Sequence, residues 1–190
     1  MAGCMALGYG IERIAYRPLR HAPRLAPLIT AIGVSIVLQN LAMMIWGREY
    51  HSFPQLIANT PHNLGGAIIN DIQIIIFVMA LAIMAGLMAV VHRTRLGRAM
   101  RAVAENQHAA QLMGVDINRV ISVTFMLGSA LAAVAGMMVS ANYGLAHYYM
   151  GFLLGLKAFT AAVLGGIGNL RGAMLGGLLL GLIESLGAGY

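Results

Sequence analysis

Few polar side chains interrupt the long apolar stretches of this sequence, and these are the residues best placed to do chemistry. An ionisable or amide group inside a membrane usually faces the interior of a helical bundle or a wet cavity. Gln39 and Asn40 are also typical of hydrogen bonds between helices, and Lys157 can extend its apolar stem to the membrane interface. The residues predicted to line or brace a translocation path are Gln39, Asn40, Lys157, Thr160 and Glu184.

The sequence contains no arrangement typical of an enzyme. Its six histidines and six acidic residues are scattered without ligand spacing such as H-E-x-x-H, and the single cysteine, Cys4, excludes multi-cysteine metal sites. Gly166, Gly168 and Gly172 only superficially resemble a dinucleotide-binding loop, and no G-x-x-x-x-G-K-[ST] motif is present. We therefore expect no catalytic residue, no metal and no cofactor, and any energy from ATP must come through a partner.

The composition predicts a membrane protein, because 59% of the residues are apolar and only 9% are charged, against about 25% charged in soluble domains. Residues 25–47, 72–91 and 120–140 have the length of about 20 apolar residues that a membrane-spanning helix needs. The glycine-rich stretches 152–168 and 172–187 are predicted to be short spans, broken helices or re-entrant segments. The expected fold is all-α, a polytopic integral membrane helical bundle in one transmembrane domain over 1–190.

The distribution of basic residues predicts how the bundle is oriented. Loops 12–24 and 92–119 together contain nine arginines, whereas loop 48–71 contains only Arg48 and loop 140–151 has neither arginine nor lysine. Basic loops mark the cytoplasmic side, so the first two are expected there and the other two outside. The net charge of +6 belongs to arginines that bracket apolar runs. We therefore expect a lipid bilayer, and no nucleic acid, as the partner of these residues.

Small residues at helical spacing predict where helices pack. Close backbone approach through such residues holds helices together in lipid. The spacing occurs at Gly128, Ala132 and Gly136, and again at Gly172 and Gly176. Such spacing predicts association and carries no activity.

The basic loop 92–119 is too rich in helix-forming residues for a passive linker. The composition predicts one short cytoplasmic helix over Leu96 to Met113, with Gly114 as its C-cap and Asp116 as the cap of the next helix. Its mixed apolar and polar surface suits docking into a groove of a partner. The segment 48–70, rich in proline, glycine and asparagine, is expected to be a substantial loop or hairpin.

Several runs of this sequence carry a resemblance to a known family. His108-Ala109-Ala110-Gln-Leu-Met-Gly114 is similar to the EAAxxxG coupling motif of bacterial ABC importer permeases, with histidine in place of the motif's glutamate. The wider run GRAMRAVAENQHAAQLMGVDINRVISVTF resembles permeases for branched-chain amino acids. The runs GLKAFTAAVLGGIGNLRGAMLGGLLLGLIES and ERIAYRPLR, the latter followed by AIGVSIVLQN, resemble the same family, of the LivH type rather than the LivM type.

The resemblance implies a permease subunit that moves leucine, isoleucine and valine into the cytoplasm across the bacterial cytoplasmic (inner) membrane. Its implied partners are a homologous LivM-type permease, two ABC ATPase subunits that bind ATP, and a periplasmic amino-acid-binding protein. Family permeases are longer at both ends, so this chain is expected to be a fragment. The residues expected to couple to the ATPase are Arg101, Glu105, His108, Ala109, Ala110 and Gly114.

Three other classes of protein remain open from the residues alone. The first is an ion- or proton-coupled secondary amino-acid carrier, in which Lys157 and Glu184 would belong to the coupling path. A structural membrane-anchor subunit fits the small-residue packing but gives no reason for an ordered cytoplasmic helix. A membrane enzyme ranks last because no site for it is found.

Overall fold

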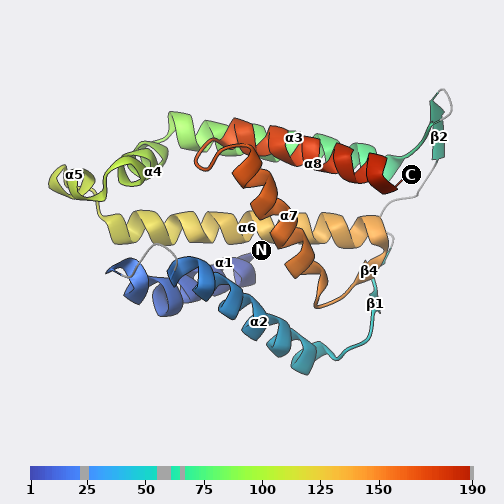
Figure 1. Cartoon of the computed structure of the whole chain (residues 1–190), viewed down its shortest axis with the longest axis horizontal. Coiled ribbons are helices and arrows are strands. Elements are labelled where there is room, and N and C mark those ends of the chain that lie inside the picture. Colours follow the sequence, from blue (N-terminus) through green and yellow to red (C-terminus); the bar gives the residue numbers. More distant parts are fainter. Residues whose placement is uncertain (22–25, 55–60, 65–66, 189–190) are drawn as a thin grey trace. The chain divides into compact units, whose positions relative to one another are not determined.

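The computed structural model describes residues 1–21, 26–54, 61–64 and 67–188, and the chain forms two compact units (Figure 1). Unit 1 contains Met1–Ala146 and unit 2 contains His147–Tyr190. Helices make up most of both units, and the expected all-α membrane fold class is confirmed. Four helices are long and apolar enough to cross a membrane among the described residues: α2 (Ala26–Trp46), α3 (Asp71–Arg93), α6 (Ile117–Tyr143) and α8 (Leu170–Ala188).

Unit 1 begins with a helix that changes its winding twice. The α-helix α1 (Ala2–Ile11) continues into a π-helix, η1 (Glu12–Tyr16), and then into a 3-10 helix, η2 (Arg17–His21). Short π-helical segments inside longer helices are frequent at functional sites. α1 packs along α6, and Gly8 lets the two helices approach, since a Cβ at this position would lie 2.0 Å from the Ser129 hydroxyl oxygen.

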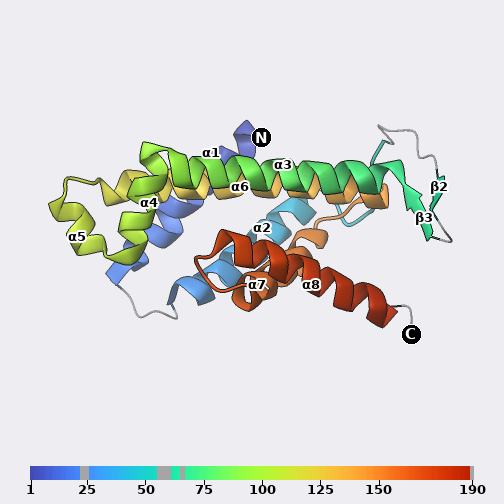
Figure 2. The same ribbon diagram turned by 90° about the horizontal axis from the view of Figure 1, so that it is seen from above.

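Helices α3 and α6 are flanked by different structures at their two ends (Figure 2). At one end lie α4 (Arg95–Glu105) and α5 (Gln107–Leu112), which connect the two helices. At the other end, the strands β2 (Pro61–Leu64) and β3 (Ala67–Asn70) form an antiparallel hairpin that leads into α3. There β1 (His51–Ser52) also pairs with β4 (Leu145–Ala146) in antiparallel register.

The expected helical boundaries agree closely with the helices of unit 1, apart from one region. α2 and α3 match the predicted stretches 25–47 and 72–91 within about two residues, and α6 is longer than the predicted 120–140. α6 begins early because the Asp116 carboxylate caps it, accepting a hydrogen bond from the Arg119 amide at 3.2 Å. It continues to Tyr143 because the helix stops only at the next residue, Gly144, which adopts the left-handed conformation with φ of 66°.

The prediction of one helix over Leu96 to Met113 is wrong. Asn106 interrupts it with an extended backbone, at φ −153° and ψ 108°, and separates α4 from α5. The Asn106 side chain accepts a hydrogen bond from the Ala109 amide at 3.1 Å, which makes it the N-cap of α5. Asparagine is among the best N-cap residues, so the capped break competes successfully with a continuous helix. The C-cap of α5 is Met113, and Gly114, expected as the cap, follows it in the left-handed conformation with φ of 80°.

Unit 2 is a hairpin of two helices, α7 (Met150–Leu164) and α8. They lie over the glycine-rich stretches for which short spans, broken helices and re-entrant segments were all open, and each is a continuous helix. Residues 165–169 form the turn, where Gly166 and Gly168 have φ of 89° and 93°. Among the described glycines of the unit, these two alone adopt a conformation that other residues would find strained.

Candidate functional site

The apex of the α7–α8 hairpin is held by direct contact between backbones. A Cβ added at Gly172 would lie 1.8 Å from the Gly165 carbonyl oxygen, and one at Gly176 would lie 2.3 Å from the Ala161 carbonyl oxygen. Distances below 3.0 Å leave no space for a side chain, so both positions require glycine. The predicted packing residues Gly172 and Gly176 therefore lie on the face where the two helices meet.

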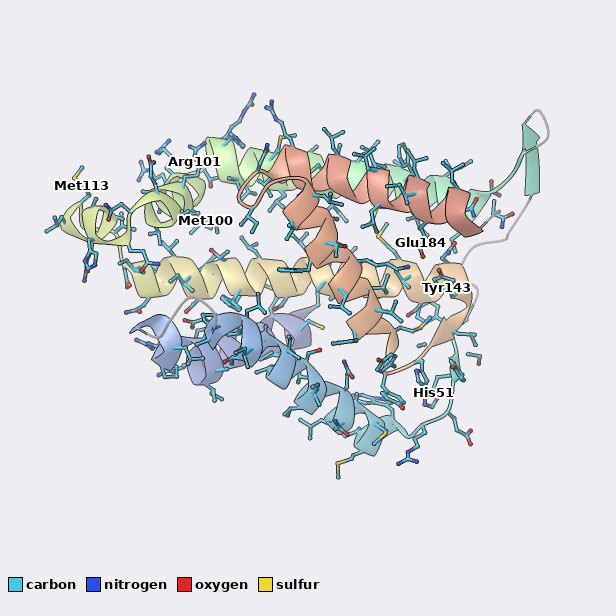
Figure 3. All side chains as sticks on the ribbon, viewed as in Figure 1. His51, Met100, Arg101, Met113, Tyr143 and Glu184 are labelled. Carbon is cyan, nitrogen blue, oxygen red and sulfur yellow. The ribbon has the colours of Figure 1, made fainter. Side chains whose placement is uncertain are left out.

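An ion pair joins the same two helices farther from the turn. The Lys157 ammonium, on α7, donates a hydrogen bond to the Glu184 carboxylate, on α8. The Lys157 side chain is 38% exposed and that of Glu184 is 53% exposed, so both can be reached from outside the unit. Figure 3 shows Glu184 on α8 beyond the crossing with α7. The Thr160 hydroxyl donates to the Lys157 carbonyl oxygen at 2.8 Å and stays with its own helix.

Gln39 and Asn40 make hydrogen bonds within α2. The Gln39 amide donates to the Ser35 hydroxyl at 3.3 Å, and the Asn40 amide donates to the Ile36 carbonyl at 2.8 Å. Both partners lie one helical turn earlier on the same helix. These residues belong to unit 1, and their predicted role in a translocation path stays a prediction.

The α4–α5 segment is anchored to the ends of α3 and α6 by small residues and caps. Gly97 allows α4 to fold back onto α3, since a Cβ there would lie 2.1 Å from the Val91 carbonyl oxygen. The Thr94 hydroxyl accepts a hydrogen bond from the Gly97 amide at 3.0 Å and caps α4. On the inner side Val103, Ala110 and Val120 form a small buried cluster. The segment is thus a defined structural element.

The outer side of this segment contains both charge and apolar surface. Leu112 and Met113 are 89% and 85% exposed, and Figure 3 shows Met113 at the outer end of α5 and Arg101 on α4. Most of the predicted coupling residues also lie on the surface, namely Arg101, Glu105, His108, Ala109 and Gly114. Ala110 is different, because it is only 4% exposed and packs inward.

A polar pocket of about 660 Å³ lies at the junction of α5 and α6. Arg17 from η2 lines it together with His108 and Asp116. Arg17, in the described part of the first arginine-rich segment (12–21), therefore lies beside the second such segment (92–119) at one end of unit 1. The β1–β4 pairing joins described parts of the two arginine-poor segments. This arrangement matches the alternation of charge along the sequence. Within the described residues, no three His, Cys, Asp or Glu side chains gather closely enough to hold a metal ion.

A comparison with protein families identifies what kind of membrane protein this is. The whole chain, residues 1–190, matches the family described as branched-chain amino acid transport system / permease component. The chain belongs to this family. It is accordingly a multi-pass membrane protein of the permease class, as the resemblance of its sequence runs implied.

Curated relatives of the permease family are similar over nearly the full chain. The high-affinity branched-chain amino acid transport system permease protein BraD of Pseudomonas aeruginosa is 49% identical over 187 residues, which is 96% of this chain and 61% of the relative. LivH of Salmonella typhimurium, which bears the same description, is 45% identical over 190 residues. LivH of Escherichia coli K12 is 44% identical over 190 residues, and both comparisons cover 97% of this chain and 61% of the relative.

The chain therefore spans about 61% of the length of the curated permeases that it matches. No solved structure matches it. These relatives are named as permease proteins of a transport system, and no observation favours the ion-coupled carrier or the membrane enzyme that the residues alone left open.

One buried acid of this permease was not selected from the sequence. Glu12, the first residue of η1, is 1% exposed, and the Ser122 hydroxyl of α6 donates to its carboxylate at 2.7 Å. Beside it, the Tyr16 ring packs on Phe125 with centroids 4.9 Å apart, and burial raises the pKa of the Tyr16 hydroxyl above 10.0. In the sequence, Glu12 is recognisable only as an acid between an apolar run and a basic run. Its hydrogen-bond partner Ser122 lies 110 residues away, so the local pattern does not reveal the contact.

Among the described residues of unit 1, no neighbouring helix packs against the glycines of α6. A Cβ at Gly128 or Gly136 would meet no atom within 4 Å, and Ala132 between them is exposed. The contact of α6 with α1 uses Gly8, a residue that the spacing analysis did not select. The packing role of Gly128, Ala132 and Gly136 stays a prediction.

Proposed function

We propose that this chain is the membrane-spanning part of one permease subunit of an ABC importer that moves leucine, isoleucine and valine into the cytoplasm. The observation that carries the proposal is the match of the whole chain to a branched-chain amino acid permease family. The names of the relatives at 44–49% identity support the same substrate class. The location proposed is the bacterial inner membrane.

The α4–α5 segment is the proposed contact with a separate ATPase subunit. It is anchored on its inner side by the Val103 cluster and presents the exposed apolar side chains of Leu112 and Met113. Large apolar side chains exposed beyond a membrane span are typical of an interaction surface. The charge pattern of the sequence predicts that this end of unit 1 faces the cytoplasm, where ATP is available.

The transport-system names of the relatives support a transporter with several components, and the resemblance of the sequence runs implies which further partners to propose. A second ATPase, a homologous LivM-type permease and a periplasmic amino-acid-binding protein would complete the importer. In this scheme the permease binds no ATP, and ATP hydrolysis takes place in the partner subunits. Alternating access of the permease pair would then carry the amino acid inward.

The decisive experiment is leucine uptake into proteoliposomes that contain the full-length permease and its partner subunits. We expect uptake that requires hydrolysable ATP on the side of the membrane where the ATPase subunits lie. This uptake should survive an ionophore. Uptake abolished by the ionophore and indifferent to ATP would replace the importer with a coupled carrier.

The ATPase contact has its own test. Replacing both Leu112 and Met113 by serine removes exposed apolar surface without disturbing the buried cluster, so the permease should remain folded while ATP-driven uptake is lost. Ala104→Ser, a small change at another exposed position of α4, is the control and should transport normally. Full uptake by the double variant would contradict the proposed contact.

A further inference from the structure

The Lys157–Glu184 ion pair is unusual for its surroundings. It lies between two helices that are otherwise apolar except near their ends, and charged groups inside membrane segments are costly. The hairpin does not depend on the pair for its closest contact, which is made by Gly165, Gly172 and Ala161 at the apex. From that apex the arms of the hairpin separate, as Figure 1 shows, and the pair bridges them at a distance from the turn.

Among the described residues of unit 2, the space beside the pair is open. Gly181 and Gly187 lie one turn before and one turn after Glu184 on α8, and a Cβ at either would meet no atom within 4 Å. Leu153, one turn before Lys157, is 51% exposed and offers apolar surface. Opposite charges, apolar surface and space are therefore found together on one helical hairpin.

We infer that Lys157 and Glu184 form a zwitterion-exchange site, in which the pair opens to bind the carboxylate of an amino acid at Lys157 and its ammonium group at Glu184. This inference rests on the proposed function for its substrate class. One ion pair is replaced by two, and the sum of charges stays zero before and after binding. No uncompensated charge enters the apolar environment, which is the main cost of moving a zwitterion there.

The site accounts for the presence of both signs. A single lysine would bind the carboxylate and leave the ammonium group of the substrate unpaired, whereas the pair offers a partner to each group. Charge-assisted hydrogen bonds are the strong ones, and truncating one partner leaves the other charge unpaired. The apolar side chain of the substrate would rest on Leu153 of α7.

The test uses chemical complementation in the full-length permease assembled with its partner permease and ATPase subunits, without the amino-acid-binding protein, which would bind leucine by itself. Binding of leucine is compared with binding of 4-methylpentanoate, which lacks the ammonium group, and of 3-methylbutylamine, which lacks the carboxylate. In Glu184→Gln the unpaired Lys157 should favour 4-methylpentanoate, and in Lys157→Gln the unpaired Glu184 should favour 3-methylbutylamine. We expect each preference to shift by about tenfold relative to the unmodified permease.

A pair that only braces the hairpin would not produce these reciprocal preferences, and equal changes for all three ligands would overturn the inference. Leu156→Met, on the residue beside Lys157, is the matched control and should leave all three affinities unchanged. Should either single variant fail to assemble, Lys157→Gln/Glu184→Gln removes both charges together. Retained leucine binding in this double variant overturns the inference, and its loss in an assembled complex supports it.

The proposed function is tested separately in the same preparations. Wild-type complexes that import leucine with ATP but show no reciprocal preference in the variants would refute the exchange site and leave the importer standing. Wild-type complexes without ATP-driven leucine uptake would refute the importer itself.

Discussion

The two units differ in the exposure of the acid that lies between their helices. In unit 2 the backbones touch directly at Gly165 and Gly172, and the ionised pair of Lys157 and Glu184 is exposed. In unit 1 a carboxylate is enclosed, since Glu12 is 1% exposed and accepts a hydrogen bond from Ser122. Each unit therefore has an acid between two helices, but only one of the two acids can be reached.

The difference teaches how to assign roles to acids in an apolar chain. A buried carboxylate with a hydroxyl partner 110 residues away fixes the position of η1 against α6. The exposed pair of Lys157 and Glu184 is not needed for the closest approach of α7 to α8, because the glycines at the apex provide that contact. The pair is therefore available to a ligand. Stability should therefore depend most on Gly172 and Glu12, and ligand selectivity on Lys157 and Glu184.

The largest loss of stability is expected when a side chain is added at the apex of the α7–α8 hairpin in unit 2. Gly172→Val places a branched side chain where the Gly165 carbonyl oxygen lies 1.8 Å from the Cβ position, so the helices must separate. Overpacking of this kind costs about 1–3 kcal/mol or more. Thermal unfolding of the purified full-length permease should occur at a clearly lower temperature.

The matched control for this apex variant is Gly181→Ala on the same helix. A Cβ at Gly181 meets no atom within 4 Å, and alanine favours a helix over glycine by about 1 kcal/mol. This variant should be unchanged or slightly stabilised. Equal destabilisation by the two substitutions would show that the apex contact is not what holds the hairpin.

The second largest loss of stability is expected when Glu12, the buried acid of unit 1, is replaced. Glu12→Leu removes the buried carboxylate and leaves the partly buried Ser122 hydroxyl without its acceptor, which costs about 1–3 kcal/mol. Thermal unfolding should again shift downward, whereas Glu184→Gln should shift it little because that acid is half exposed. A larger loss of stability in Glu184→Gln than in Glu12→Leu would reverse the comparison.

Much of the fold was predictable because long apolar runs determine their own structure. Residues 25–47 and 72–91 have no alternative in a bilayer to a helix that satisfies its own backbone. The glycines of 152–187 made that region ambiguous, since glycine weakens an isolated helix. In the structure, Gly172 and Gly176 are helical because a neighbouring helix occupies the space that they leave. That neighbour is not visible in a local pattern.

The candidate site was predictable residue by residue but not in its pairing. Lys157 and Glu184 were selected as charges within apolar runs, yet only the hairpin brings together two residues that lie 27 apart. Glu12 was missed because it lies beside a run of arginines, where an acid looks ordinary. The prediction of a single helix over 96–113 was wrong because Asn106 has only a weakly unfavourable helix propensity. That propensity does not reveal that Asn106 caps a new helix.

The third prediction compares a buried position and an exposed position of the α4–α5 segment in unit 1. Ala110→Leu overfills the cluster with Val103 and Val120, and should increase hydrogen exchange throughout α5. Ala109→Leu is the matched change at an exposed position, and it should leave exchange unaltered while lowering ATP-driven uptake under the proposed contact. Faster exchange in Ala109→Leu alone would contradict the assignment of the two faces.

The smallest effect is expected at the break between α4 and α5. Asn106→Ala removes the acceptor of the 3.1 Å hydrogen bond from the Ala109 amide, and loss of an N-cap costs about 1 kcal/mol. Local opening of α5 should become about fivefold more frequent, which hydrogen exchange at the first amides of α5 measures. Gln107→Ala, one residue later, removes no cap and should leave these amides unchanged. Because Asn106 joins two short helices of one segment and neither of the long packed ones, the unfolding temperature of the whole permease should hardly move. A large shift would mean that this segment helps to hold α3 and α6 together, as Glu12 does for η1 and α6.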